Sequence, residues 1–465
     1  MIELLQYLFL AMPYVVVVAL ALLICIFLVT AYRTPTAGLV AVGFLCWFET
    51  LIPNAAPLQL GLQIYVPDII SILLGLLAFM RAIFSRNRPP LLISWYLFVL
   101  SIGLSFAIGI SNFGTYAGGA LRPNFYAVAI ASYFMTFSFD EARIRRAISG
   151  LSWIGLGLVA AVFARWLIVE IPISGLLPPG GSFDVAGTSK LRTVNAEQAA
   201  VIAQIFLVGL FYPQTSALLQ GFRLLVPLFA LAIIGLQHRS VWLGVLAAIG
   251  SRFVLPTAGR RGSTQLLMLS IVLGLIMTPV VLSGQLGGIA QDISRSATRA
   301  VALTDTAQVR LESWTFAINK WRTGGPRALA IGLPMGTSMD RYSLSSNNEL
   351  RKISFQAHNY FVQTLFSTGL IGLGSSLFVY AWVMRKLYRL ASDPAEGPAA
   401  SALLLMLVLQ LAFYVTYGIT YMQGFVLGLA AAYAMTKHVH LKSAIVLSKI
   451  TKPLPSRMQS VLHRG

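Results

Sequence analysis

The sequence predicts an all-α, polytopic transmembrane protein with about 12–13 spans and one large extracytoplasmic loop. Hydrophobic residues make up 57% of the 465 residues and charged residues only 11%, whereas soluble domains carry about 25% charged residues. Several apolar runs also exceed the ~18 residues that mark a membrane-spanning helix. A β-barrel is not expected, because barrel strands alternate in segments of ~10 residues and these runs do not.

The candidate spans follow one another along the chain. They cover residues 5–30, 36–52, 64–81, 91–109, 119–138, 150–170, 195–212, 224–237, 239–254, 264–284, 357–384, 400–417 and 421–436. The first 30 residues carry one charge, Glu3, and no basic leading segment, so we expect a retained span and not a removable signal. These segments divide the chain into transmembrane residues 1–284, a large loop at 285–356, transmembrane residues 357–436 and a basic tail at 437–465.

Lys and Arg residues are distributed unequally between alternate loops. Twenty lie in one set of loops and in the tail, and four in the other set of short loops, namely Arg122, Lys190, Arg192 and Arg239. Because loops rich in Lys and Arg stay in the cytoplasm, the first set and the C-terminus are predicted to be cytoplasmic. We interpret the net charge of +19 as this signal and as attraction to anionic lipids at the cytoplasmic loops. No nucleic-acid partner is expected, since no basic–aromatic domain is present.

The large loop at 285–356 carries nine basic and five acidic side chains. Loops of this length are exempt from the charge rule and are usually either functional or disordered. Leu311, Trp314, Ile318 and Trp321 recur at helical spacing. We therefore predict a helix that lies at the membrane interface with its indoles at headgroup depth.

Two of the five histidines, His238 and His358, are predicted to face outward. His358 lies where the large loop enters the span at 357–384, so its imidazole is a candidate general base at the outer interface. The structural alternative for His358 is an interfacial histidine satisfied by a backbone carbonyl.

Three arginines are further candidates, because a charge near the membrane is costly unless it is paired or faces a polar cavity. Arg239 lies between two short spans, and its structural alternative is snorkelling to the interface. Arg310 opens the Trp-bearing helix and could instead be a solvated loop charge. Arg192 precedes a helix start and could instead pair with Glu197.

Other site chemistries lack their residues on the predicted outer face. No His, Cys or carboxylate residues have ligand spacing there, so no metal or other cofactor is expected. The loop at 52–63 has no acidic residue, and Asp68 lies further along, in the next span. What remains is a set of arginines, whose forks suit pyrophosphate oxygens, and a histidine that can take a proton from a sugar hydroxyl.

Three pieces of the second half share a pattern with one family. They are His238-Arg239-Ser240-Val241-Trp242-Leu243, then Arg310-x-x-x-Trp314, and then His358-Asn359 followed by Gly369 and Gly372. In order and spacing these pieces resemble the bacterial O-antigen ligase / O-antigen polymerase superfamily over about residues 190–375, with Arg192 and Asn195 matching faintly. The chain departs from the family in having His238 where Ser is frequent, and in a loose glycine stretch at Gly332-Leu-Pro-Met-Gly336.

The resemblance implies a GT-C-like membrane glycosyltransferase of the bacterial inner membrane. Its donor would be a glycan on undecaprenyl pyrophosphate, and its acceptor the hydroxyl of a glycan or of lipid A–core. Arg239 and Arg310 would bind the pyrophosphate, and His358 would orient or deprotonate the acceptor. Arg192, Trp314 and Asn359 would contact substrate.

Three functions stay open on the sequence. A polymerase would extend lipid-linked repeats into exopolysaccharide, capsule or O-antigen, and we favour it because many such chains serve that reaction. A ligase would attach the glycan to lipid A–core or to protein. A polysaccharide flippase would show internal repeats and polar residues at the bilayer midplane, and we find no repeat. Other polysaccharide-assembly proteins would be partners compatible with each function.

Overall fold

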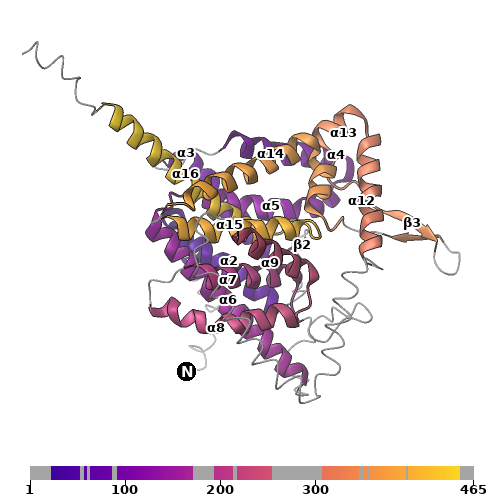
Figure 1. The fold of residues 1–465 in the computed structure, drawn as a ribbon. Helices are drawn as coiled ribbons and strands as arrows, with labels where there is room; N and C mark the ends of the chain where they lie inside the picture. The colour runs from indigo at the N-terminus through magenta and orange to yellow at the C-terminus, as the bar shows by residue number, and fades with distance from the viewer. Residues whose placement is uncertain are drawn as a thin grey trace, which may run out of the picture.

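The computed structural model describes residues 22–52, 57–59, 63–85, 92–170, 193–212, 217–253, 306–344, 350–353, 357–393 and 396–450. In these residues the protein is a bundle of α-helices with two small hairpins, which confirms the all-α, polytopic class (Figure 1). Several parts of the predictions lie outside the described residues: residues 5–21 of the first span, Arg192, the span at 264–284, the large loop as far as residue 305, and the tail beyond residue 450.

The helices follow the predicted spans in chain order. After the helical residues Leu22–Arg33 come α2 (Pro35–Leu51), α3 (Val66–Phe84), α4 (Ile93–Phe113), α5 (Thr115–Met135), α6 (Glu141–Glu170), α7 (Ala196–Phe211), α8 (Ala217–Gly235), α9 (Arg239–Arg252), α12 (Thr306–Thr323), α13 (Gly325–Ile331), α14 (Tyr360–Leu390), α15 (Gly397–Tyr414) and α16 (Tyr421–Ile450). The antiparallel hairpins pair β1 (Leu58–Gln59) with β2 (Gln63–Ile64) and β3 (Arg341–Leu344) with β4 (Leu350–Ile353).

Five of the described helices are long and apolar enough to cross a membrane by length and composition: α3, α4, α6, α14 and α15. Shorter apolar helices coincide with further predicted spans, among them α2 and α7. In α15, 78% of the residues in its apolar stretch are buried, against only 28% in α3, so α15 is central and α3 peripheral. The total of 12–13 spans stays a prediction.

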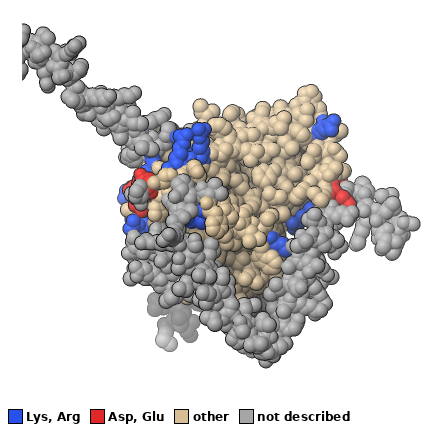
Figure 2. All heavy atoms as spheres, in the orientation of Figure 1, with Lys and Arg blue, Asp and Glu red and all other residues tan. Residues whose placement is uncertain are grey.

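The outside of the bundle is apolar. Phe79, Ile93, Leu246 and Phe378 are all more than half exposed. Figure 2 shows a broad uncharged surface, with the described Lys, Arg, Asp and Glu side chains gathered at its margins. Large exposed apolar surfaces mark contact with a membrane or a partner, and here they follow the helices predicted to span the bilayer.

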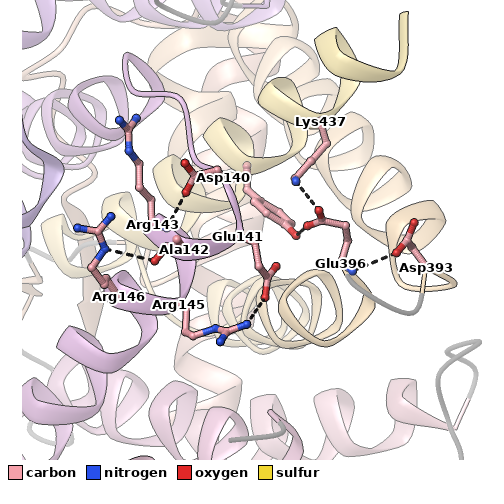
Figure 3. Close-up of polar contacts among 10 residues, drawn as sticks. Asp140, Glu141, Ala142, Arg143, Arg145, Arg146, Asp393, Glu396 and Lys437 are labelled. Carbon is pink, nitrogen blue, oxygen red and sulfur yellow. Dashed lines mark hydrogen bonds and ion pairs between the residues drawn. The ribbon is translucent and has the colours of Figure 1, made fainter. Parts of the chain in front are cut away.

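The two ends of the bundle carry different parts of the chain. In Figure 1, α14, α5 and α15 run across the view, with α12, α13 and β3 at one end and the C-terminal part of α16 leaving at the other. The predicted cytoplasmic residues Arg143, Arg145 and Arg146 gather with Glu396 and Lys437 at the α16 end (Figure 3). The C-terminal part of α16 and the described part of the large loop, α12 and α13, therefore lie at opposite ends, in keeping with the charge distribution.

The large loop docks onto the bundle through glycine positions. The helix α14 is interrupted at Gly369, where φ is 64° and ψ is −165°. A Cβ there would run into the backbone of Ala330 and Gly332, and a Cβ on Gly332 would run into Ser367. Leu333 N donates to Phe366 O at 2.7 Å in the same interface. Gly332 is therefore a close backbone contact between the loop and α14, whereas Gly336 packs against Phe113 and Ala117, where α4 meets α5.

Candidate functional site

The helix predicted from the tryptophan spacing is present as α12. Ser313 and Ala317 are buried, whereas Leu311 is exposed. Trp314 Nε1 donates to Ala357 O at 2.6 Å, and Trp321 Nε1 donates to Ala328 O at 2.7 Å. The indole N–H groups therefore bind protein carbonyls, and the depth of the indoles relative to the membrane stays a prediction.

His358 has an unusual backbone conformation. Its φ is +41°, in the left-handed region that non-glycine residues rarely adopt. Neighbours on both sides hold this conformation. Trp314 binds the carbonyl of Ala357 before it, and Tyr360 N donates to Tyr417 O at 2.9 Å after it. Strained residues of this kind persist only where the surroundings over-determine them, and they cluster at functional sites.

Asn359 caps α14 and is 5% exposed. Its Oδ1 accepts from Val362 N at 3.0 Å, and its Nδ2 donates to Val415 O at 2.8 Å. Because both ends of the amide are engaged within the protein, the geometry favours a positioning role for Asn359 over the predicted substrate contact. Asn is one of the residues preferred at helix N-caps, and this capping role was not predicted from the sequence.

Arg310 and His358 meet at the ring of Tyr417. The guanidinium carbon of Arg310 lies 5.6 Å from the centroid of that ring. The His358 ring lies 6.1 Å from it at an interplanar angle of 67°. Partial burial and the positive charge of Arg310 both lower the pKa of His358, although the residue keeps an exposed edge. The imidazole therefore stays neutral near pH 7, which is the form a general base requires.

Arg239 begins α9, directly after the second outward histidine. His238 is buried, and its Nε2 lies 2.9 Å from Val194 O. His238 is therefore a histidine whose ring is satisfied by a backbone carbonyl, which is the arrangement raised above as the alternative for His358. Gln237 has φ +54° and forms the turn that brings this segment onto the start of α7.

Helix packing places Arg239 at the same end of the bundle as His358. Arg252, at the far end of α9, lies over the ring of Phe211 at the far end of α7. A Cβ on Gly244 would lie 3.0 Å from Leu409 O, so the middle of α9 faces the second half of α15. From there α9 runs back to Arg239 while α15 runs on to the segment that holds Tyr417.

Two further residues at this end, Arg165 and Tyr417, were not predicted from the sequence. Arg165 Nη1 donates to Thr193 O at 2.6 Å, next to the Val194 carbonyl that His238 contacts. Its signal was a charge inside the span predicted at 150–170. Tyr417 gave no such signal, because an aromatic residue near a span end is common in membrane proteins.

Asp68, which was not a candidate site residue, binds other residues of the protein through both carboxylate oxygens. Its Oδ1 lies 3.2 Å from Arg122 Nε and accepts from the Tyr126 hydroxyl, while its Oδ2 accepts from Tyr65 N at 2.7 Å. Over the part of the chain that the structure describes, no group of three or more His, Cys, Asp and Glu residues could hold a metal ion.

These features define the class: a polytopic helical membrane protein with a cluster of arginine, histidine and aromatic residues at one end. Residues 224–379 match the family described as O-antigen ligase. The match supports the O-antigen ligase/polymerase superfamily inferred from the motifs, and it contains Arg239, Arg310, Trp314, His358 and Asn359. No curated protein matches the chain.

Proposed function

We propose that the protein is a membrane glycosyltransferase that moves a glycan from undecaprenyl pyrophosphate to an acceptor hydroxyl at the outer face of the bacterial inner membrane. One observation carries the proposal: Arg310 lies beside His358 at the end of the bundle that holds the large loop. The family match supports a lipid-linked glycan donor and an acceptor in general terms.

The reaction needs one bond formed and one broken. The acceptor oxygen attacks the anomeric carbon of the first donor sugar, and the bond from that carbon to the phosphate oxygen breaks. Undecaprenyl pyrophosphate leaves with the electron pair. Arg310 and Arg239 stabilise the charge that grows on the pyrophosphate oxygens, since guanidinium groups bind such oxygens through paired N–H donors.

His358 is the group that takes the proton of the acceptor hydroxyl. Arg310 has a double role here, because the same charge that binds pyrophosphate also keeps the imidazole neutral. Trp314 and Asn359 hold the backbone on either side of His358. Arg192, two residues before Val194, is proposed to bind substrate from the neighbouring loop.

We favour polymerisation of repeat units into exopolysaccharide, capsule or O-antigen. A ligase that transfers the glycan to lipid A–core or to protein is the second candidate, and the description of the matched family favours it. The flippase is the weakest candidate, because Arg310 and His358 converge at one end of the bundle and do not line a path through it.

The proposed orientation places the α12 end outside the cell and the C-terminal tail in the cytoplasm. The separation of α12 from the C-terminal part of α16 supports it (Figure 1). Anionic lipids would then contact the basic loops at the α16 end, and polysaccharide-assembly proteins are proposed as further partners.

The test is the glycan profile of a deletion strain complemented with the wild-type protein or with His358→Ala. Single repeat units left on their carrier or on the final acceptor indicate the polymerase. Full-length polymer retained on undecaprenyl pyrophosphate indicates the ligase. A wild-type profile from His358→Ala would contradict the catalytic role of His358 and favour a transporter.

A further inference from the structure

The connection between α15 and α16 lies under the candidate site but outside the family match at 224–379. Its backbone is bonded to the segment that carries His358. Val415 O accepts from Asn359 Nδ2 at 2.8 Å, and Tyr417 O accepts from Tyr360 N at 2.9 Å. The connection therefore sets the position of the residues that follow His358.

The Tyr417 ring occupies the centre of the cluster. Phe413 stacks on it with a centroid distance of 4.8 Å and an interplanar angle of 12°. The guanidinium carbon of Arg310 lies 5.6 Å from the same centroid, and the His358 ring meets it edge to face at 6.1 Å. Stacking on Phe413 orients the ring, so its position does not depend on Arg310.

We propose that Tyr417 is a positioning residue: its ring holds the Arg310 guanidinium beside His358, and it does so through its π face and not through its hydroxyl. The proposal rests on the proposed glycosyl transfer for its effect on rate. It extends the site to a segment beyond the matched stretch.

The physical basis is the attraction between a cation and the negative face of an aromatic ring. An arginine on a helix in a large loop has several accessible rotamers, and the ring selects those that keep its charge near His358. Among the described residues, Arg310 on α12 and Tyr417 on the α15–α16 connection face His358. Tyr360, on its own segment, is turned inward and stacks on Tyr414 at 4.4 Å.

The direction of the pH effect follows from the charges. Arg310 lowers the pKa of His358 when it is held close. If the ring is lost and the guanidinium moves away, the pKa of His358 rises toward its ordinary value. The protonated, inactive imidazole then persists to higher pH, and the acid limb of the activity profile moves upward.

The experiment compares Tyr417→Leu with the conservative Tyr417→Phe in purified, lipid-embedded protein. Transfer is assayed with a lipid-pyrophosphate glycan over a range of pH. Tyr417→Leu should lower kcat by about tenfold and move the acid limb to higher pH. Tyr417→Phe, which keeps the ring, should recover the activity to within about twofold and restore the wild-type limb. Tyr388→Leu, an exposed tyrosine near the far end of α14, is the matched control.

A direct titration separates this proposal from the proposed function. The protein is labelled with ¹⁵N-histidine, and the His358 signal is assigned by its loss in His358→Ala. The imidazole pKa should be higher in Tyr417→Leu than in wild type, whether or not transfer is detected. If wild-type protein transfers no glycan but this shift is seen, the proposed function fails and the positioning role stands.

Three outcomes would overturn the positioning role. One is an unchanged His358 titration in Tyr417→Leu. Another is Tyr417→Phe as impaired as Tyr417→Leu, which would assign the effect to the hydroxyl. The third is a loss of activity with no movement of the acid limb, which would indicate general damage. Tyr417→Met replaces Tyr417→Leu if the latter does not accumulate in the membrane.

Discussion

Two sites at opposite ends of the bundle hold their positive charges in different ways. At the α16 end, Arg145 and Lys437 contact carboxylates: Arg145 Nη2 lies 3.1 Å from Glu141 Oε1, and Lys437 forms an ion pair with Glu396 (Figure 3). At the α12 end, Arg310 lies against the ring of Tyr417, which also contacts the His358 imidazole.

The two arrangements differ in how much of the cation's charge and how many of its N–H donors remain available to a ligand. A carboxylate neutralises the charge of its partner and occupies its N–H donors. An aromatic ring orients a guanidinium without cancelling its charge, because the ring carries a quadrupole and no net charge. The carboxylates therefore neutralise Arg145 and Lys437 within the protein, whereas the ring of Tyr417 leaves the charge of Arg310 able to attract phosphate oxygens.

The largest expected effect is the loss of the imidazole. We expect His358→Ala to lower transfer by about 10²–10⁴-fold, because a positioned general base contributes that much to a rate. The protein should still insert, as shown by wild-type amounts in purified membranes. Replacement of a tail histidine, His440→Ala, is the control and should leave transfer unchanged. Near-normal product from His358→Ala would contradict the role of His358 as the general base.

Arg310→Lys tests whether the geometry of the guanidinium matters beyond its charge. We expect transfer to fall by about 10²-fold, since an ammonium cannot make the forked contact with phosphate oxygens. The matched change at the other end is Arg143→Lys, where the guanidinium donates to Ser138 O. That variant should retain its activity. Equal activity in both variants would mean that charge alone acts at position 310.

Two tryptophans with similar hydrogen bonds sharpen the comparison within the α12 end. Trp314→Phe and Trp321→Phe each remove one indole-to-carbonyl bond, at Ala357 and Ala328 respectively. Ala328 O keeps a second bond, from Gly332 N at 2.9 Å, whereas Trp314→Phe removes the indole from the buried carbonyl of Ala357. Leaving a buried carbonyl unpaired costs about 1–3 kcal/mol, so Trp314→Phe should lower thermal stability more than Trp321→Phe. Only Trp314→Phe should also lower transfer, by about tenfold, because its carbonyl precedes His358. Equal loss of transfer in both would reduce Trp314 to a packing role.

The pH dependence of the wild-type protein gives a smaller effect with a defined sign. Burial and Arg310 lower the pKa of His358, so the base form persists below the ordinary imidazole value. We expect kcat/KM to hold as pH falls through about 6.5 and to decline only at lower pH. A decline that begins above that value would show that Arg310 does not act on His358 in the working enzyme.

The smallest expected effect on transfer is at the α16 end. Glu396→Gln removes the carboxylate that both Lys437 and Tyr433 contact. We expect the free energy of unfolding to fall by about 1–3 kcal/mol, because the Lys437 and Glu396 side chains are only 17% and 18% exposed. Transfer should not change. A strong loss of transfer would show that the two ends are coupled.

The sequence predicted the helices well, because each span is a local apolar run whose signal does not depend on its neighbours. The helix α12 was predicted in the same way, from its tryptophan spacing. The bond from Trp314 to the carbonyl of the distant Ala357 could not be predicted from that spacing, because Leu311 shares the same stripe and is exposed.

The candidate residues of the site were predicted from their chemical type and from the family resemblance. The contacts that support these residues could not be predicted from the sequence. The bonds from Val415 and Tyr417 to the His358 segment join residues more than 50 positions apart, and no spacing rule reports such an approach. The glycines at 332 and 369 are a similar case, because each is explained only by the backbone that packs against it.

That glycine contact bears on how chimaeras of this protein could be built. The loop backbone at Gly332 and the interruption of α14 at Gly369 fit each other without room for a Cβ on either side. A loop taken from a relative would therefore need its own first half of α14 to dock. The transferable unit runs from α12 through Gly372, across the boundary between loop and span. Exchanges that cut at that boundary should yield protein that inserts but leaves the loop undocked.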